Sequence, residues 1–172
     1  MTSDAKRPLR VLFLCTGNSA RSQMAEAILN AKGKGRFEAH SAGTDPAARV
    51  NPYAIAALRR AGIEWSGHPP RSVDNLERED WDFVITVCDR AKESCPVLPG
   101  RPITAHWGME DPAEVTGDEA TVSRAFDLAL LHIANRLDLF LALPTEKIER
   151  LALEQRVRAL PLAPLPFSRP AV

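Results

Sequence analysis

The sequence predicts an α/β fold: a three-layer sandwich with a four-stranded parallel sheet and helices on both faces. Two observations lead to this prediction. Short apolar runs alternate along the chain with longer segments of helical periodicity. Strands separated by helices run parallel, because each helix carries the chain back to the same edge of the sheet. In such sheets the functional site lies at the carboxyl ends of the strands.

Glycine, proline and polar residues mark where the individual elements end. The predicted strands are residues 10–14, 37–42, 82–87 and 101–106. The predicted helices are residues 19–32, 51–61, 119–141 and 145–160, with a short helical segment at 89–94. In the first helix, Met24, Ala27, Ile28 and Ala31 fall on one face, which we expect to pack against the sheet.

We expect one catalytic domain over residues 1–143, followed by a C-terminal helix and a proline-rich tail over residues 144–172. The length of 172 residues suits a single domain. The last segment, ALPLAPLPFSRPAV, is too rich in proline for regular structure. The extension is interpreted either as a helix packed on the edge of the domain with a loose tail, or as a dimerisation arm.

The charge balance excludes several classes of partner. Lys plus Arg and Asp plus Glu both number 22, so no large basic surface favours nucleic acid or an anionic membrane.

No apolar signal region opens the chain, and no apolar run is long enough to cross a bilayer. The three cysteines do not form an even set suited to a secreted disulfide framework. We therefore expect a cytoplasmic protein whose cysteines serve chemistry.

The turn between the first predicted strand and helix carries the strongest functional pattern. Cys15 ends the strand, and Arg21 opens the helix six residues later. Backbone N–H groups of such a turn and the positive end of a helix bind anions. A guanidinium grips two oxygens of a tetrahedral anion with its planar fork. The pattern therefore predicts an oxyanion cradle with a nucleophilic sulfur beneath it.

Residues inside this turn support the same interpretation. Gly17 and Asn18 are residue types that tolerate left-handed backbone geometry. Ser22 is placed to donate a hydrogen bond to the sulfur, so we expect the pKa of Cys15 to be lowered. The alternative is a buried structural cysteine and a surface arginine, since a cysteine and an arginine at this spacing also occur together by chance.

Cys88 and Cys95 form a second sulfur pair. If residues 89–94 are helical, their Cα atoms stand about 10 Å apart, at a rise of about 1.5 Å per residue. A disulfide needs Cα atoms within about 7 Å, so a bridge requires this segment to unwind, which suggests a redox switch. Two alternatives remain: ordinary buried cysteines, or a metal site that adds His106, although the spacing is unlike that of zinc sites.

A candidate general acid follows the fourth predicted strand. Displacing an oxygen from a tetrahedral oxyanion requires protonation of the leaving group. Asp111 precedes Pro112, which restricts it to extended geometry and so directs its side chain. Glu110 is the neighbouring rival. An Asp-Pro pair alone is also common in turns. The position of Asp111 after the fourth predicted strand is therefore what indicates a catalytic role.

Together these residues resemble the low-molecular-weight protein tyrosine phosphatase superfamily, and within it the three-cysteine, thioredoxin-coupled arsenate reductases. The resemblance covers about residues 10–140. The matching segments are CTGNSARSQMAE at 15–26, HSAGT at 40–44, VNPYAI at 50–55, VCDRAKESCPVLPG at 87–100 and HWGMEDPA at 106–113. It implies the low-molecular-weight phosphatase fold.

The resemblance also implies a role for each site residue. Cys15 is then the nucleophile, Arg21 the oxyanion clamp and Asp111 the general acid. Cys88 and Cys95 then relay electrons from Cys15, with arsenite released and no cofactor needed. The remaining oxyanion-binding residues of the loop are Thr16, Gly17, Asn18, Ser19, Ala20 and Ser22.

The electron donor and the reaction have alternatives. The donor implied is thioredoxin, whereas the 144–172 extension resembles a subgroup that uses glutathione with glutaredoxin. A phosphotyrosine phosphatase would use Cys15, Arg21 and Asp111 alone, although Ala113 and Glu114 stand where such enzymes place aromatic residues. A non-enzymatic, oxyanion-binding redox sensor is the third alternative.

A metal site is not expected. Some reductases of this family bind potassium beside the anion loop, and Glu26 and Ser41 match positions used there. Pro69 and Arg71 stand where a hydroxyl and a carboxylate are found in those proteins. Because Arg71 brings a positive charge to the place of a metal ligand, we predict that this chain holds no metal ion there.

Overall fold

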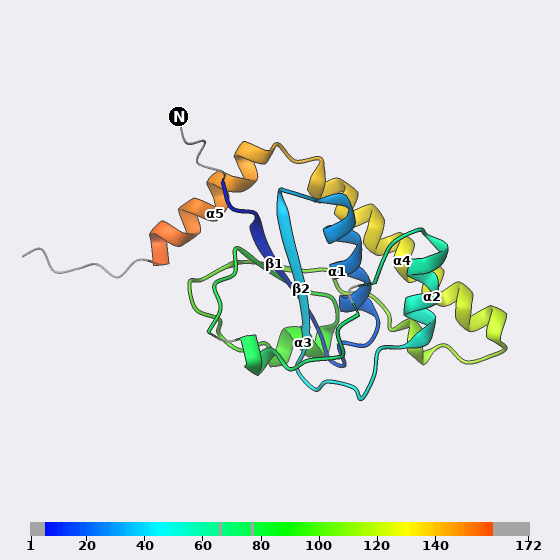
Figure 1. Cartoon of the computed structure of the whole chain (residues 1–172). Helices are drawn as coiled ribbons and strands as arrows, with labels where there is room; N and C mark the ends of the chain where they lie inside the picture. The colour runs from blue at the N-terminus through cyan, green and yellow to red at the C-terminus, as the bar shows by residue number, and fades with distance from the viewer. Residues whose placement is uncertain (1–5, 66, 77, 160–172) are drawn as a thin grey trace, which may run out of the picture.

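A computed structural model describes residues 6–65, 67–76 and 78–159. Four parallel strands form one sheet in the order β2-β1-β3-β4 (Figure 1). The strands are β1 (Leu9–Cys15), β2 (Phe37–Gly43), β3 (Phe83–Thr86) and β4 (Ile103–His106). The predicted α/β sandwich with a four-stranded parallel sheet is confirmed.

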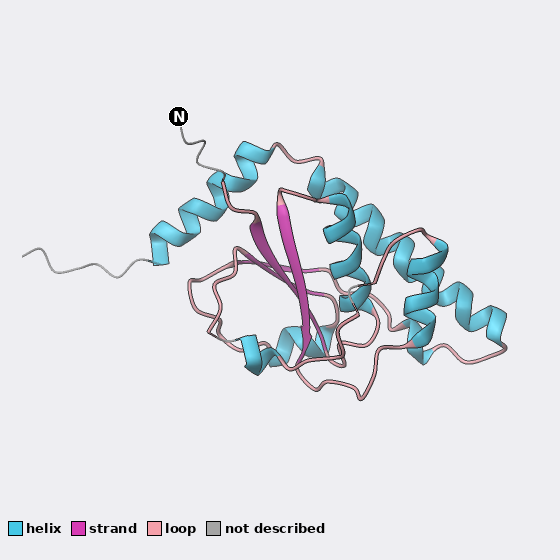
Figure 2. Ribbon diagram, in the orientation of Figure 1, coloured by secondary structure: helices cyan, strands magenta, loops and turns pink. Residues whose placement is uncertain are grey.

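Helices lie on both faces of this sheet (Figure 2). On one face α1 (Arg21–Lys32), α2 (Pro52–Arg60) and α4 (Glu119–Leu141) pack against one another. The other face carries α3 (Asp89–Ser94) and the short 3₁₀ helix η1 (Val73–Leu76). A second 3₁₀ turn, η2 (Pro112–Glu114), precedes α4, and α5 (Thr145–Ala159) contacts β4.

The core is centred on β1. Val11, Leu12, Phe13 and Leu14 are completely buried, because the strand is central in the sheet and helices or loops cover both of its faces. The strand register places Cys15 beside Gly43 of β2 and Leu14 beside Thr86 of β3. The carboxyl ends of three strands therefore meet around Cys15.

Helix α1 is more enclosed than its sequence predicts. Met24, Ala27 and Ile28 of the predicted apolar face are buried, but Ala31 is exposed. The first three quarters of the helix are buried on every side, since the sheet, α2 and α4 all contact it. The helix begins at Arg21, two residues later than predicted, and β4 begins at Ile103 instead of 101 because Arg101 adopts a left-handed φ of 46°.

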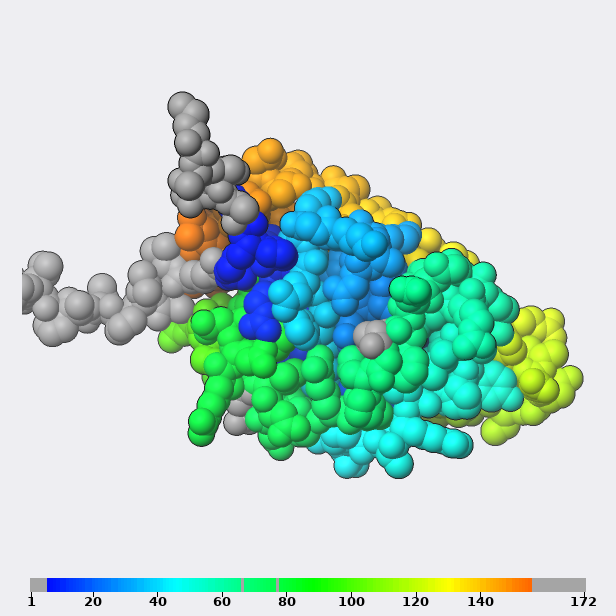
Figure 3. Space-filling view, in the orientation of Figure 1, coloured from blue at the N-terminus to red at the C-terminus, as the bar shows by residue number. Residues whose placement is uncertain are grey.

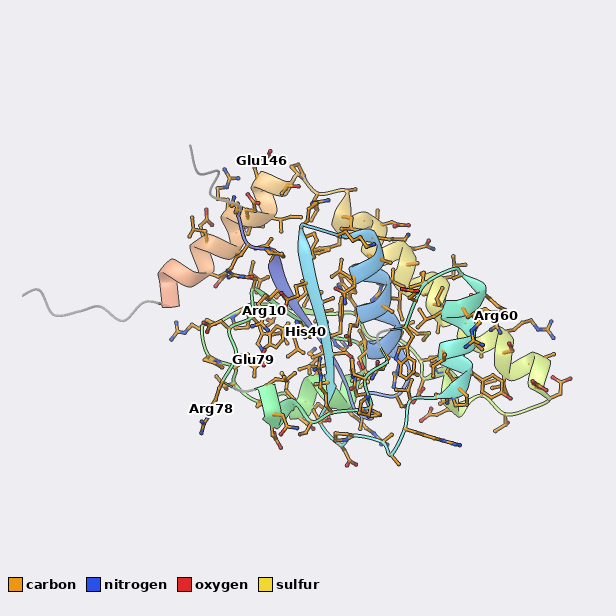
Figure 4. All side chains as sticks on the ribbon, viewed as in Figure 1. Arg10, His40, Arg60, Arg78, Glu79 and Glu146 are labelled. Atoms are coloured by element: carbon orange, nitrogen blue, oxygen red, sulfur yellow. The ribbon has the colours of Figure 1, made fainter. Side chains whose placement is uncertain are left out.

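The segment before β3 covers the second face of the sheet. Arg10 of β1 reaches outward to Glu79 and lies over the ring of Trp81, and His40 of β2 contacts the same ring edge-on (Figure 4). In Figure 3 the green chain around residues 78–95 lies against the blue and cyan chain of β1 and β2. Ser72 pairs with Gly43, which brings residues 68–72 next to the turn after β1.

The predicted C-terminal helix exists as α5. Its Ile148 and Ala152 are buried, whereas Leu151 is exposed. Leu160 and the predicted proline-rich tail lie outside the described residues, and the division at residue 143 stays a prediction. Among the described residues, no helix is long and apolar enough to cross a membrane.

Candidate active site

Two cysteines lie at the carboxyl ends of neighbouring strands. Cys15 is the last residue of β1, and Cys88 follows β3 by two residues. Val87 donates its N–H to the carbonyl of Leu14 at 2.8 Å, so the parallel pairing extends beyond β3. Thr16 Oγ1 lies 3.4 Å from Cys88 Sγ. Both sulfurs therefore lie at the carboxyl edge of the sheet, where the functional site of such a fold is expected.

The turn from Cys15 to Ala20, here called the anion loop, presents its carbonyls away from the site. The carbonyls of residues 15, 16, 17 and 19 accept hydrogen bonds from the N–H groups of residues 44, 45, 47 and 51, at 2.8 to 3.1 Å. Gln23 Nε2 donates to the fifth carbonyl, that of Asn18. No side chain caps α1 at Ala20. Apart from the amides of Asn18 and Ser22, which bond to the sulfur of Cys15, this arrangement leaves the amides of the loop and of the first helical turn as donors for an anion.

Asn18 holds the loop in shape. It is fully buried with a φ of 49°, the left-handed geometry predicted for it. Its Nδ2 donates to Ser22 Oγ at 2.8 Å and to Ser41 Oγ at 2.9 Å. Gly17, the other residue of the turn that tolerates this geometry, does not have a positive φ.

The thiol of Cys15 lies at the floor of the loop. Asn18 donates its N–H to Cys15 Sγ at 3.1 Å, and Ser22 Oγ lies 2.8 Å from the same sulfur. Burial nevertheless raises the pKa of Cys15, while the hydrogen bonds from Ser22 and Asn18 and the charge of Arg21 act in the lowering direction. The predicted lowering of this pKa is wrong, because the sulfur is far more enclosed than the turn sequence indicated.

Arg21 joins the anion loop to the loop that follows β4. Its side chain is only 10% exposed; it donates to the carbonyl of Met109 at 2.8 Å and lies 3.2 Å from Asp111 Oδ2. Asp111 Oδ1 accepts from the N–H of Ala113 at 3.0 Å, and its extended backbone agrees with the constraint expected from Pro112. The carboxyl group is thus held beside the guanidinium.

Most of the predicted site residues line one cavity of about 380 Å³. The lining residues are Cys15, Thr16, Gly17, Ser19, Ala20, Arg21, Cys88, Asp89, Arg90, Met109, Asp111 and Glu114. Asn18 and Ser22 are buried behind this lining. Glu110, the rival acid, is exposed and is not part of the lining, so the geometry favours Asp111.

Cys95 is the one predicted site residue that lies apart. It follows the last residue of α3 and is half-buried, while Cys88 caps the other end of that helix, its sulfur accepting from the N–H of Ala91 at 3.4 Å. The predicted short helix between the two cysteines is confirmed. Their Cα atoms are therefore about 10 Å apart along the helix axis, and a bridge requires α3 to unwind.

One contact that sequence reasoning missed holds α3 in place. His106 Nε2 lies 2.8 Å from Asp89 Oδ1 at the first residue of the helix, and His106 Nδ1 lies 2.7 Å from Thr86 Oγ1. The position of His106 at the end of a predicted strand was a signal for a role at this edge, but nothing in the sequence indicated its partner.

The candidate potassium position does not fit a metal ion. Glu26 is 4% exposed; its Oε2 accepts a hydrogen bond from Ser41 Oγ and lies 2.6 Å from His68 Nε2. Arg71 Nε donates to the backbone carbonyl of Ser41 at 2.9 Å, so the predicted positive charge is present. The hydroxyl, imidazole and guanidinium groups around Glu26 Oε2 and the Ser41 carbonyl are a donor set that does not suit a cation, and the absence of a metal ion stays a prediction.

Comparison with known proteins supports the family resemblance. The sequence model of the low molecular weight phosphotyrosine protein phosphatase family matches residues 10–129. The chain belongs to this family. An arsenate reductase of Oceanobacillus iheyensis is 37% identical over 130 residues, which cover 76% of this chain and 93% of that protein.

Solved structures agree with this assignment. The arsenate reductase from Archaeoglobus fulgidus superposes with a TM-score of 0.58 at 36% identity, covering 74% of this chain and 98% of its own. A thioredoxin-dependent arsenate reductase from Corynebacterium glutamicum has a TM-score of 0.56 at 28% identity, over 78% of this chain and 64% of that one. The resemblance predicted from the sequence motifs is thereby confirmed.

Proposed function

We propose that this protein reduces arsenate to arsenite through a relay of Cys15, Cys88 and Cys95. The observation that carries the proposal is the second cysteine in the cavity of the first: Cys88 lines the same space as Cys15 and lies beside Thr16 of the anion loop. Arsenic(V) accepts electrons from thiols, whereas phosphorus(V) does not. The names of the relatives point to the same reaction.

Substrate binding uses the anion loop and Arg21. The loop amides and the guanidinium bind the arsenate oxygens, and Cys15 Sγ attacks arsenic from below. The sulfur–arsenic bond forms as one arsenic–oxygen bond breaks. Asp111 protonates the departing hydroxyl, which leaves as water, and the thiol proton of Cys15 balances the proton that Asp111 gave up.

The electron transfer follows as a thiol exchange. Cys88 attacks Cys15 Sγ, a disulfide forms, and the sulfur–arsenic bond breaks with its electron pair remaining on arsenic. Arsenic passes from the +5 to the +3 state and leaves as arsenite with the proton of Cys88. Two thiols have then become one disulfide, which accounts for both electrons.

Cys95 completes the cycle at the surface. It attacks Cys88, restores the thiol of Cys15 and leaves a Cys88–Cys95 disulfide once α3 has unwound. A dithiol donor then reduces this bridge. We propose thioredoxin as the donor, by analogy with the thioredoxin-dependent relative, with glutathione and glutaredoxin as the alternative. Either donor works in a reducing compartment, so we place the reaction in the cytoplasm.

Hydrolysis of phosphate monoesters is the second candidate function. Cys15, Arg21 and Asp111 lie together as this reaction requires. Among the described residues that line the cavity, however, none is aromatic, so a phenyl phosphate finds no ring to stack on. We therefore propose hydrolysis as a weak side reaction.

Two variants test the relay against hydrolysis. Cys88→Ser abolishes arsenite release but leaves hydrolysis of an aryl phosphate nearly unchanged, since only the relay needs the second sulfur. Cys95→Ser releases about one arsenite per enzyme and then stops at a Cys15–Cys88 bridge. Arsenate reduction at the wild-type rate by Cys88→Ser would refute the relay. Turnover assays with thioredoxin, and separately with glutathione and glutaredoxin, identify the donor.

A further inference from the structure

A second arginine lines the cavity above Cys15, and the proposed chemistry gives it no task. Arg90 is the second residue of α3 and follows Cys88 by two positions. It is exposed, and among the described residues none is an ion-pair or hydrogen-bond partner of its guanidinium. A guanidinium without a partner at the edge of an oxyanion cavity is available to bind the same ligand.

The N-terminal end of α3 lies at the anion loop. Cys88 caps this end of the helix, and its sulfur lies 3.4 Å from Oγ1 of Thr16. Helical side chains tilt toward the N-terminus of their helix, so the side chain of Arg90 tilts toward the cavity. Cys88, Asp89 and Arg90 accordingly all line it. The two arginines therefore reach the cavity from different elements, Arg21 from α1 and Arg90 from α3.

The charge balance of the cavity calls for more than one cation. Three carboxyl groups line the same space and oppose the binding of an oxyanion: Asp89, Asp111 and Glu114. Asp89 contacts His106 and Asp111 contacts Arg21, whereas Glu114 has no ion-pair partner among the described residues. Without Arg90, one arginine that is already shared with Asp111 would face these groups and the charge of the substrate.

We propose that Arg90 is a second oxyanion-binding residue, which holds an oxygen of the bound arsenate together with Arg21. The proposal rests on the anion site of the proposed function and not on the thiol relay. A second cation also discriminates between substrate and product, because arsenate is an anion whereas arsenous acid is uncharged near neutral pH. Reduction therefore removes the attraction to both arginines, and this favours release of the product.

Binding of inorganic phosphate tests the proposal, because phosphate has the shape and charge of arsenate and takes no electrons from thiols. Its Kd is measured by calorimetry under reducing conditions and checked as competitive inhibition of aryl phosphate hydrolysis. Arg90→Gln should raise the Kd by about 3- to 10-fold at low ionic strength, and Arg90→Lys should raise it less. The control Lys92→Gln removes an exposed charge of the same helix outside the cavity lining, and it should stay within about twofold of wild type.

The dependence on salt separates an effect of charge from an effect on structure. The screening length is about 10 Å at 0.1 M ionic strength and about 3 Å at 1 M, so an exposed charge loses its reach as salt is added. The difference in phosphate Kd between wild type and Arg90→Gln should therefore shrink as sodium chloride is raised toward 1 M. Both proteins should melt at similar temperatures, because the side chain is exposed.

Any of three results would overturn the proposal. Arg90→Gln could bind phosphate as tightly as wild type at low ionic strength. Lys92→Gln could lose as much affinity as Arg90→Gln, which would assign the effect to the overall charge of α3. The loss could also persist at high salt and be equally large in Arg90→Lys, which would mean a structural role. Absence of phosphate binding by the wild type would refute the anion site itself, whereas absence of arsenite release alone would refute only the relay.

Discussion

Gly43 ends β2 directly against the backbone of the anion loop, and replacing it by alanine perturbs the loop without touching a reactive group. A Cβ at this position would lie 2.4 Å from the carbonyl oxygen of Thr16 and 3.0 Å from the backbone nitrogen of Asn18. Ordinary contacts at a Cβ begin at 3.4 Å, so the loop backbone has to retreat by about 1 Å.

A displacement of this size has a calculable consequence. Misplacing a reacting group by about 1 Å costs on the order of 100-fold in rate, and overpacking of this kind costs about 1–3 kcal/mol of stability. We therefore expect Gly43→Ala to lower kcat/KM about 100-fold for both aryl phosphate hydrolysis and arsenate reduction. Steady-state assays and urea unfolding at the same temperature measure the two effects separately.

Gly35→Ala is the matched control. Gly35 has a φ of 80°, and a Cβ there would have no neighbour within 4 Å. The strain of a left-handed alanine costs about 1–2 kcal/mol, similar to the cost at Gly43, but far from the loop. Its activity should equal that of wild type. Near-normal activity of Gly43→Ala, or an equal loss in Gly35→Ala, would show that close backbone approach does not control the site.

Three further predictions concern the acid, the nucleophile and α3. Asp111→Asn removes the proton donor and lowers both activities by about 10²- to 10⁴-fold in steady-state assays; unchanged rates would assign the acid elsewhere. The pKa of the Cys15 thiol is raised in the folded state. The thiol therefore contributes to the free energy of unfolding below its unfolded-state pKa, and this contribution is lost as the pH rises through its folded-state pKa. Urea unfolding of wild type and Cys15→Ala is measured near neutral pH and in alkaline buffer. The difference between their free energies of unfolding should shrink as the pH rises, and a growing difference would contradict a raised pKa of Cys15. Asp89→Ala removes the contact between α3 and His106, so the Cys88–Cys95 bridge should form faster after one turnover. Alkylation and mass spectrometry measure the rate of bridge formation. Slower formation in the variant would mean that this contact favours the exchange.

The sequence was sufficient wherever the signal was local. An apolar strand, a polar turn and a helix placed Cys15 and Arg21 correctly, and the alternation of elements brought Cys88 and Asp111 to the same edge of the sheet. Parallel topology makes this inference reliable, because it gathers the ends of all strands on one side. The helix between Cys88 and Cys95 was likewise predictable from six residues of helical composition.

What the sequence could not predict depends on contacts between distant segments. His68 lies in a loop of irregular composition, and its pairing with Glu26 spans 42 positions. The direction of the Cys15 pKa depends on how completely α1, the sheet and the loops enclose the sulfur, which the turn motif does not show. The close approach of Gly43 to the backbone of the anion loop is also invisible in the motif, because Gly43 lies on β2 and meets the loop only in the folded protein.

The fate of the three sulfurs after a single encounter with arsenate is the decisive measurement. Reduced protein is mixed with excess arsenate in the absence of any donor, and arsenite is counted while alkylation and peptide mass spectrometry locate the disulfide. The relay predicts one arsenite per chain, a Cys88–Cys95 bridge and a free thiol at Cys15. Arsenite release with Cys88 and Cys95 still reduced, or a bridge formed without arsenite, would contradict it.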